Sequence, residues 1–385
     1  MMEAKRESTA SKTEKAKAFA KKNTVLLIAL ALALLSMVLV PPDGEYAGYY
    51  DVKTLCCLFG TLAVVCALKN IHFFSILAQR IIILTGSERT AALALVYITF
   101  IGSMLIANDM ALITFLPLGY FVFSVTDSKR DMAVVFILQN IAANLGGMLT
   151  PFGNPQNLYL YAHYSIANGE FMSIMFPPFA VSVVLITLCC LFLPKRRLQI
   201  KASDQGKSQS LPPMRTAFYL VLFAMTILMV FRLLPVWLVL AILIVSLLIA
   251  DRKALGMVDY CLLLTFVCFF TFAGNMARIE PVRNLFSSLL QKNTLLTAVL
   301  SCQFISNVPS AILLSQFTQN YPALLIGVNI GGTGTLIASL ASLITFREFG
   351  SHYRGEGKFY IKLFSAFNFS FLLVLTLFSL FVCKV

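Results

Sequence analysis

Two stretches of the chain decide the fold: residues 144–158 read NLGGMLTPFGNPQNL, and residues 329–343 read NIGGTGTLIASLASL. They align without a gap, and the identical positions are Asn144/Asn329, Gly146/Gly331, Gly147/Gly332, Thr150/Thr335 and Leu158/Leu343. Each stretch interrupts a long apolar run with glycines and with amide or hydroxyl side chains. The repetition predicts two related halves, each with a helix that breaks near its middle.

A second pair of interruptions lies upstream of the first. Residues 106–108 (Ile-Ala-Asn) match residues 305–307 (Ile-Ser-Asn), and each triplet again divides an apolar run. The breaks are expected at Asn108-Asp109 and at Ser306-Asn307. An aspartate, Asp51 or Asp259, stands at the head of an earlier apolar run in each half. The chain is therefore interpreted as two repeats, each in the order helix, surface helix, broken hairpin, broken helix, helix.

The composition places these breaks inside a membrane. The chain is 59% hydrophobic and only 12% charged, with a mean hydropathy of +0.84, whereas soluble domains usually carry about 25% charged residues. An all-α polytopic membrane protein is predicted, because in lipid every backbone amide must be satisfied within its own segment. Irregular backbone at membrane depth is tolerated only where it is buried in protein or lines a cavity. The breaks therefore indicate one shared cavity.

Polar segments divide the chain into four parts. A basic cytoplasmic tail covers residues 1–23, a first transmembrane half 24–194, a cytoplasmic linker 195–214 and a second transmembrane half 215–385. The re-entrant hairpins are expected at 90–125 and 294–320, and the discontinuous helices at 131–165 and 322–346. Simple crossings, which bring the total to about nine full crossings, are expected at 24–40, 53–69, 172–193, 215–231, 237–250, 259–275 and 359–382. Helices along the membrane surface are expected at 71–84 and 279–291.

The net charge of +13 indicates membrane topology rather than nucleic-acid binding. Of the 30 Lys and Arg residues, 24 fall on one side of the predicted crossings and 6 on the other. Basic residues favour the cytoplasmic side, so we expect a plasma (inner) membrane protein with its N-terminus in the cytoplasm and its C-terminus outside. An odd number of crossings separates Asp51 from Asp259, which predicts inverted repeats.

Asp109 is the charged residue placed deepest within an apolar run. A charge at the bilayer centre costs at least about 2.5–3.5 kcal/mol, so a bound sodium ion or a proton is expected to offset it. The alternative is that Asp109 caps the second arm of the hairpin, since Asp is a favoured N-cap residue. The two roles are compatible.

Oxygen-bearing side chains at the two hairpin tips suit a hard cation such as sodium. Asn108 and Asn307 occupy matched tips, and the glycines free backbone carbonyls at the breaks. Hydrogen bonding between helices is the alternative role for a membrane-embedded Asn. The residues expected at the coupling-ion site are Asp109, Asn108, Gly147, Gly153, Ser306, Asn307, Gly332 and Gly334.

The helix segments beyond the breaks are expected to point their positive N-terminal ends inward, which suits an anion. No Lys or Arg lies near a break in the sequence, so helix dipoles and bound cations would hold the anion. Close packing of helices is the alternative role for the glycines. The residues expected to bind the anion are Asn108, Asn154, Gln156, Asn157, Ser306, Asn307, Thr335 and Ser339.

These motifs resemble the ion transporter superfamily, which includes arsenite permeases, citrate transporters and divalent anion:sodium symporters. The resemblance covers most of residues 50–385 and rests on AND at 107–109, GGMLTPFGNPQN at 146–157, SN at 306–307 and GVNIGGTGTLIASLASL at 327–343. It implies that the tips and breaks hold the coupling ions and the anion, and that helices outside the repeats form a scaffold for a homodimer. The Asn-Asp tip is more similar to arsenite permeases, whereas the Gly-Asn-Pro-Gln-Asn break at 153–157 is more similar to an uncharacterised branch of anion permeases. The resemblance therefore leaves the substrate open.

The expected function is secondary active transport of a small anion, a di- or tricarboxylate or an inorganic oxyanion, coupled to sodium or a proton by alternating access. A cation/proton antiporter or an arsenite efflux permease that uses Asp109 is the alternative. An enzyme is disfavoured, because the apolar runs contain no HExxH, GxSxG or acidic pair. Neither a cofactor nor a transition-metal site is expected, since the nine cysteines lie in apolar runs without CxxC spacing.

Overall fold

The computed structural model describes residues 23–124, 128–197 and 211–383 of the chain. Nearly all of this described part is helical, and its only β-structure is an isolated antiparallel bridge between Ser87 and Arg197. The prediction of an all-α membrane protein is confirmed. The predicted basic tail, apart from Asn23, lies outside the described residues, as do residues 198–210 of the predicted linker.

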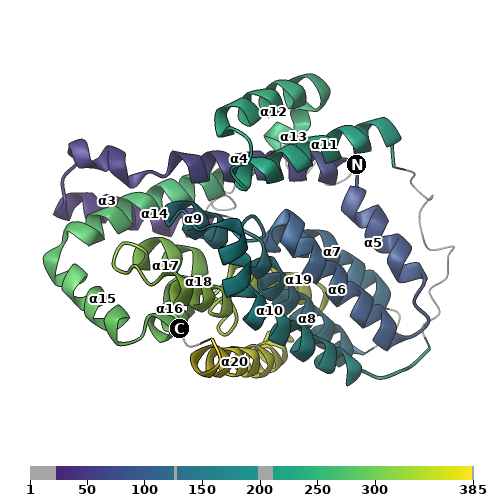
Figure 1. Ribbon diagram of the computed structural model, residues 1–385. Helices are drawn as coiled ribbons and strands as arrows, with labels where there is room; N and C mark the ends of the chain where they lie inside the picture. The colour runs from purple at the N-terminus through teal and green to yellow at the C-terminus, as the bar shows by residue number, and fades with distance from the viewer. Residues whose placement is uncertain (1–22, 125–127, 198–210, 384–385) are drawn as a thin grey trace, which may run out of the picture.

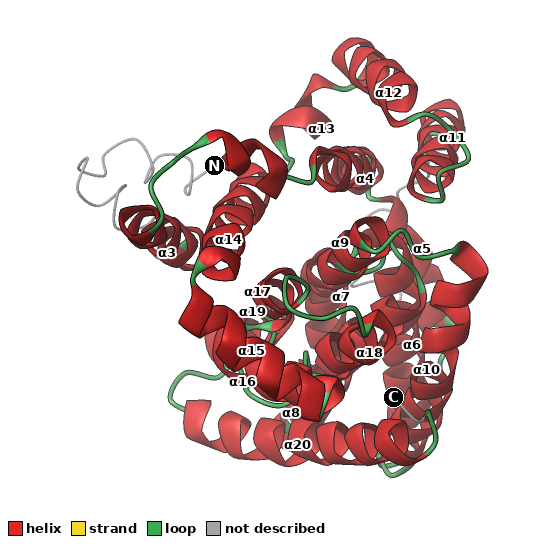
Figure 2. Cartoon of the chain, turned by 60° about the vertical axis from the view of Figure 1, so that its left-hand side comes forward, coloured by secondary structure: helices red, strands yellow, loops and turns green. Residues whose placement is uncertain are grey.

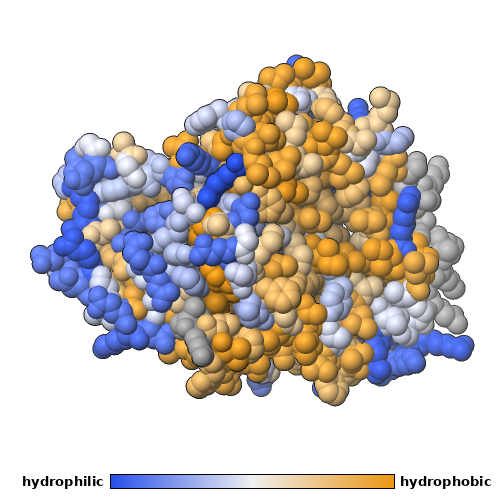
Figure 3. All heavy atoms as spheres, viewed as in Figure 1, coloured by the Kyte–Doolittle hydropathy of each residue, from blue (hydrophilic) through white to orange (hydrophobic). Residues whose placement is uncertain are grey.

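Seven helices in the described part are long and apolar enough to cross a membrane. They are α4 (Val52–Asn70), α6 (Glu88–Ile106), α8 with η3 (Lys129–Leu149), α10 (Asn168–Leu191), α11 (Pro213–Val230), α14 (Tyr260–Arg278) and α20 (Gly357–Phe381). Figure 3 shows apolar side chains in a broad band over the middle of the molecule, with polar side chains gathered at the end formed by α15 (Glu280–Lys292). This distribution is typical of a protein embedded in lipid.

The two halves run through the same order of elements (Figure 1). The first repeat contains α4, α5 (Phe73–Ile83), the hairpin of α6 and α7 (Asn108–Phe123), the broken pair α8 and α9 (Pro155–His163), and α10. The second repeat contains α14, α15, the hairpin of α16 (Thr294–Ile305) and α17 (Asn307–Leu314), the broken pair α18 (Tyr321–Ile330) and α19 (Leu340–His352), and α20. α5 and α15 are the helices predicted to lie along the membrane surface. The inverted relation of the halves and the number of crossings remain predictions.

The first helix of each half begins with the same cap. Asp51 accepts a hydrogen bond from the backbone N–H of Thr54 at 3.0 Å, and Asp259 accepts one from that of Leu262 at 3.0 Å. The backbone angles agree as well, with φ/ψ of −81°/85° at Asp51 and −78°/82° at Asp259. A carboxylate at this position satisfies an otherwise unpaired amide and complements the helix dipole. Each cap fixes where the half begins.

The helices outside the two repeats each pack on the first helix of the other repeat (Figure 2). α3 (Thr24–Leu39) leads into the first half yet packs on α14 of the second. α11, α12 (Val236–Ala250) and the short α13 (Arg252–Gly256) lead into the second half yet pack on α4 of the first. Many apolar side chains of α3 and α12 are exposed in the monomer, among them Leu35, Val38 and Ile249. Such exposure is expected of surfaces that contact lipid or another subunit.

Polar contacts at matched positions join the segment before each repeat to the first helix of the other repeat. Asp43 precedes the Asp51 cap and forms a two-pronged ion pair with Arg278, at the end of α14, with N–O distances of 3.0 and 2.6 Å. Asp251 precedes the Asp259 cap and accepts two hydrogen bonds from Nδ2 of Asn70, at the end of α4, at 3.0 and 2.8 Å. Each lead-in segment is therefore fastened to the first helix of the other half.

Candidate transport site

Both hairpins turn at a single residue. α6 ends at Ile106 and α7 begins at Asn108, so the first turn is Ala107, one residue earlier than the predicted break at Asn108 and Asp109. The second turn is Ser306, between α16 and α17. Ala107 and Ser306 have positive φ angles of 64° and 74°. This extended region at positive φ is almost confined to glycine, and a residue with a side chain held there stores strain that often marks a functional site.

The asparagine that follows each turn makes the same local hydrogen bond. Oδ1 of Asn108 accepts from the N–H of Asp109 at 2.9 Å, and Oδ1 of Asn307 accepts from the N–H of Val308 at 2.9 Å. Both asparagines are buried, with exposed fractions of 4% and 3%. The two tips are thus built alike, as their matched sequence positions predict.

Each hairpin tip is fastened to the break of its own half by a matched threonine. Oγ1 of Thr150 donates to the carbonyl of Met104 at 2.8 Å, and Oγ1 of Thr335 donates to the carbonyl of Gln303 at 3.0 Å. In the second half, the N–H of Asn307 also donates to the carbonyl of Ala338 at 2.9 Å. Hairpin and break therefore form one unit in each half.

A network of amide side chains joins the two breaks. Nδ2 of Asn154 donates to Oδ1 of Asn329 at 3.3 Å, and Nδ2 of Asn329 donates to Oδ1 of Asn157 at 2.6 Å. Nδ2 of Asn108 donates to Oδ1 of Asn144 at 3.3 Å. Asn144 and Asn329 were not expected as site residues, although their identical positions in the two stretches were a visible signal. A buried polar network of this kind specifies one arrangement of its helices, since each unpaired amide would cost free energy.

The glycines of the breaks lie where a side chain would collide. A Cβ atom built on Gly147 would lie 2.4 Å from Oδ1 of Asn154, and one on Gly153 would lie 2.3 Å from the carbonyl of Gly147. A Cβ on Gly332 would lie 3.0 Å from Nδ2 of Asn307, and Gly334 has a φ of 113°. These four glycines, predicted to hold the coupling ion, allow close approach of the break to its neighbours.

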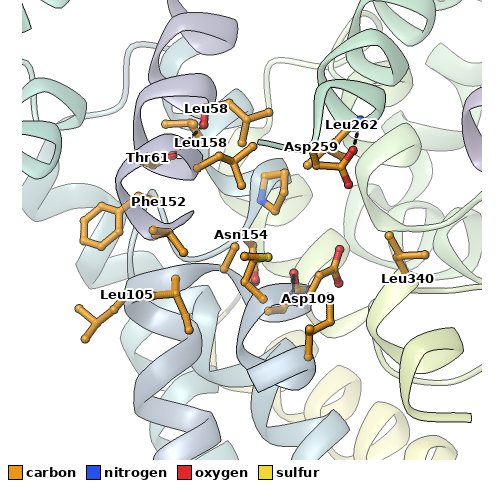
Figure 4. Close-up of a pocket in the computed structure, with 18 of the residues that line it drawn as sticks. Leu58, Thr61, Leu105, Asp109, Phe152, Asn154, Leu158, Asp259, Leu262 and Leu340 are labelled. Atoms are coloured by element: carbon orange, nitrogen blue, oxygen red, sulfur yellow. Dashed lines mark hydrogen bonds between the residues drawn. The ribbon is translucent and has the colours of Figure 1, made fainter. Parts of the chain in front are cut away.

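Two cavities adjoin Asp109. One of about 100 Å³ is lined by Asn108, Asp109 and Asn154 together with Thr61, Asp259 and apolar residues. In Figure 4, Asp109 and Asp259 lie at different ends of this cavity. The other cavity, of about 230 Å³, brings together many of the predicted anion-binding residues. Its polar lining includes Asn108, Asp109, Gln156, Ser306, Asn307 and Ser339.

Two of the predicted anion-binding residues, Asn157 and Thr335, line neither cavity. The predicted coupling-ion glycines also line neither cavity; they are Gly147, Gly153, Gly332 and Gly334. Nδ2 of Asn157 donates to the carbonyl of Gly147 at 3.1 Å, so its side chain is hydrogen-bonded to the backbone of the first break. Thr335 uses its hydroxyl for the bond to Gln303. Both residues therefore contact the framework of the breaks rather than the cavities around Asp109.

Unpartnered acceptor oxygens surround the cavities. Oδ1 of Asp109, Oδ1 of Asn154 and Oε1 of Gln156 are buried and have no hydrogen-bond partner. An unsatisfied buried acceptor costs roughly 1–3 kcal/mol, and more when it is charged. None of the residues that line the two cavities in the described chain is Lys, Arg or His. The site therefore lacks a positive side chain to neutralise Asp109.

Four helix N-termini converge on the same place. Asn108 and Asn307 are the first residues of α7 and α17, while Pro155 and Leu340 are the first residues of α9 and α19. All four residues line the 230 Å³ cavity. Each helix N-terminus carries a partial positive charge of about one half. The site thus offers carboxylate and amide oxygens to a cation and helix dipoles to an anion.

Clusters of three or more His, Cys, Asp or Glu residues able to hold a metal ion do not occur among the described residues. The oxygens named above are instead suited to a hard monovalent cation or to a proton. An all-helical membrane protein whose paired helix breaks enclose such a site belongs, as a class, with transporters.

The comparisons with known proteins agree with this class. The family model described as "Citrate transporter" matches residues 13–325 of the chain. An uncharacterized transporter of Methanocaldococcus jannaschii is 32% identical over 84% of this chain and 88% of its own length. The inner membrane protein YbiR of Escherichia coli is 27% identical over 84% of this chain and 86% of its own. The chain belongs to the citrate transporter family.

Two more distant similarities complete the comparison. The silicon efflux transporter LSI3 of Oryza sativa subsp. japonica is 28% identical over 42% of this chain and 33% of its own length. The crystal structure of the YdaH transporter of Alcanivorax borkumensis matches 92% of this chain and 96% of its own, with 12% identity and a TM-score of 0.47. The predicted relation to the ion transporter superfamily is confirmed by the family match and the curated relatives.

Proposed function

We propose that this membrane transporter carries a small anion by secondary active transport and that Asp109 binds the coupling cation, sodium or a proton. One observation carries the proposal: the buried Oδ1 of Asp109 has no partner, and the residues lining both adjoining cavities include no basic side chain. A carboxylate in this setting needs a cation or a proton, because an unpaired charge within the membrane costs several kcal/mol. Binding of a cation or a proton at Asp109 removes this cost and is therefore favourable.

The substrate of the proposed transporter is a di- or tricarboxylate or an inorganic oxyanion. The helix N-termini at Asn108, Asn307, Pro155 and Leu340 supply partial positive charge, which favours an anion. A cation bound at Asp109 would add a full positive charge beside them. Binding of the anion would then depend on the cation, and this dependence is what couples their movement.

A second candidate function is proton-coupled efflux of an uncharged hydroxylated compound. Three unpartnered oxygens, on Asp109, Asn154 and Gln156, are acceptors, and a ligand with several O–H donors would satisfy them. A relative named as a silicon efflux transporter is in keeping with this candidate. A cation/proton antiporter is a related alternative, because it would also exchange its substrate for a proton bound at Asp109.

The proposal includes the orientation of the protein in the membrane and its assembly. We place the protein in the plasma (inner) membrane with the N-terminus in the cytoplasm and the C-terminus outside, because 24 of its 30 basic residues then face the cytoplasm. The exposed apolar faces of α3 and α12 are proposed to contact lipid or a second copy in a homodimer.

The variant Asp109→Asn tests the proposal in proteoliposomes. The cap position of α7 is Ala107 and not Asp109, so the alternative role of Asp109 as the helix cap is wrong. Asn keeps the shape of the side chain, so the variant is expected to fold as stably as the wild type. Uptake of citrate, succinate, sulfate and arsenite is measured with and without a sodium or pH gradient. The proposal expects substrate movement by the variant to lose its dependence on the gradient.

The matched control is Asp131→Asn. Asp131 lies in the first turn of α8, as Asp109 lies in the first turn of α7, but it lines neither cavity. Coupling is expected to survive this change. Unchanged coupling in Asp109→Asn would remove Asp109 from the ion site. Gradient-driven export without import in the wild type would select the efflux candidate.

A further inference from the structure

A third cavity, of about 530 Å³, differs from the other two in its charge. It lies among α4, α9, α11 and α12 and is lined by Asp51, Lys53, Arg232, Tyr161 and Trp237, among others. The cavities around Asp109 have no basic lining residue, whereas this cavity has two. A cavity with low-dielectric walls concentrates the field of such charges.

Arg232 is held in place by the protein. Its Nη2 donates to the carbonyl of Tyr161 at 2.6 Å and its Nη1 to that of Ile166 at 3.4 Å. Cζ lies 4.3 Å from the centre of the Tyr161 ring. These contacts occupy two of the five N–H groups of a guanidinium. Arg232 is therefore fixed in position with donors to spare for a ligand.

Asp51 offsets only one of the two positive charges in this cavity. Oδ1 accepts from the N–H of Thr54 at 3.0 Å and Oδ2 accepts from its hydroxyl at 2.6 Å, so both oxygens serve the cap of α4. With Arg232 and the exposed Lys53, the formal charge of the lining residues is positive. The cavity is consequently suited to an anion.

The basic cavity adjoins the transport site across one side chain. Leu158, on α9, lines both this cavity and the 100 Å³ cavity beside Asp109, and only 3% of its surface is exposed. The identical position in the second stretch, Leu343, lines the 230 Å³ cavity. A ligand in the basic cavity would be separated from the Asp109 site by Leu158.

We propose that this basic cavity is an anion-binding vestibule, in which Arg232 and Lys53 capture a carboxylate or oxyanion substrate before it passes Leu158. The vestibule rests on the proposed function in one respect, that the transported molecule is an anion. It supplies the fixed positive charge that the central site lacks. On the predicted topology it opens to the outside, where an imported anion arrives.

Trp237 provides a direct probe of the vestibule. It is the only tryptophan in the sequence, it lines this cavity, and 64% of its surface is exposed. Iodide is an anionic quencher of tryptophan fluorescence, caesium a cationic one and acrylamide a neutral one. The full chain is reconstituted in nanodiscs of phosphatidylcholine, and quenching by each is compared between wild type, Arg232→Gln, Lys53→Gln and Lys292→Gln. Lys292 is an exposed control on α15, outside the cavity.

The vestibule predicts a specific pattern of quenching. Iodide should quench the wild type more strongly than caesium does, and the iodide constant should fall about twofold in Arg232→Gln and Lys53→Gln, the effect of one unit charge about 8 Å away in water. Acrylamide quenching should stay unchanged, which shows that the fold is intact. Lys292→Gln should behave as wild type, and citrate or succinate should reduce iodide quenching.

Other results would overturn the proposal. Equal iodide quenching in wild type and Lys53→Gln would overturn the proposal, even if Arg232→Gln failed to fold. Loss of iodide quenching in phosphatidylglycerol discs, with no effect of citrate in phosphatidylcholine discs, would assign the cavity to an anionic lipid headgroup. Quenching requires no transport, so a failure here is separate from a failure of the Asp109→Asn coupling test.

Discussion

Ala107 and Ser306 hold the same strained backbone conformation, with φ/ψ of 64°/152° and 74°/160°. Each is the single turn residue of a hairpin, and each is followed by an asparagine whose Oδ1 accepts the next backbone N–H. Such a conformation costs roughly 1–3 kcal/mol in a residue with a side chain. The surrounding contacts must therefore hold both tips in one geometry, as expected of a site that binds an ion.

The strain at the first tip predicts opposite effects of two substitutions. Ala107→Gly removes the Cβ and should leave the thermal stability equal or raise it, since relief of strain outweighs a loss of about 0.5–1 kcal/mol for the entropy of glycine. Ala107→Val adds a β-branched side chain at positive φ and should lower the melting temperature clearly. Melting of the purified protein in detergent measures both. If the two variants melt at the same temperature, Ala107 is not strained in the protein.

The matched asparagines predict parallel losses of transport. Asn108→Ala and Asn307→Ala each remove an oxygen from the tip, and a tip without that oxygen cannot replace the hydration shell of a cation. We expect each variant to fold, judged by gel filtration, and to lose at least tenfold in substrate uptake by proteoliposomes. Ser301→Ala is the control, because this part-buried serine bonds Ser310 and lines neither cavity beside Asp109. Normal uptake by both asparagine variants would reduce these residues to helix packing.

The breaks were predictable from the sequence because they oppose the surrounding pattern. A polar or glycine-rich interruption in an apolar run is visible without a structure, and the structure places turns at Ala107 and Ser306 and breaks between α8 and α9 and between α18 and α19. The exact turn residue at the first tip was missed by one position. Alanine has no preference for positive φ, so tertiary contacts rather than local propensity select Ala107.

Contacts between the halves could not be predicted from the sequence, for a different reason. Asn329 was visible as a position identical to Asn144, but its bonds to Asn154 and Asn157 depend on how the two halves pack. The crossed packing of α3 on α14 likewise reflects tertiary contacts between apolar helices of similar composition. Hydropathy identifies such helices without specifying their neighbours.

The predicted topology can be tested at two glycines with open surroundings. A Cβ on Gly44 or Gly256 would meet no atom within 4 Å, and both residues are exposed, so a cysteine at either should not disturb the fold. In a background freed of the nine native cysteines, a membrane-impermeant maleimide applied to intact cells should label Gly44→Cys but not Gly256→Cys. Labelling of both after lysis is the control. Equal labelling in intact cells would contradict the odd number of crossings on which the inverted repeats depend.

The ion pair between Asp43 and Arg278 predicts a pH-dependent contribution to stability. The guanidinium of Arg278 lowers the pKa of Asp43, chiefly through their hydrogen bonds, and backbone N–H groups of Glu45 and Tyr46 act in the same direction. A carboxyl group whose pKa is lower in the folded protein stabilises it above the unfolded pKa, and this stabilisation is lost as the pH falls through the folded pKa. Wild type should therefore melt above Asp43→Asn at pH 7, and the difference should shrink below about pH 4, where the unfolded carboxyl is protonated.

The matched polar contact at Asp251 separates this effect from general acid sensitivity. Its partner, Asn70, is neutral, so Asn70→Ala removes hydrogen bonds but no cation. Melting curves of Asp43→Asn, Asn70→Ala and wild type are compared between pH 3 and pH 8, at low and high salt. Only the Asp43→Asn difference should diminish in high salt, because screening weakens an exposed ion pair. A wild-type advantage over Asp43→Asn that stayed constant from pH 8 to pH 3 would show that the ion pair does not fasten α3 and its loop to α14.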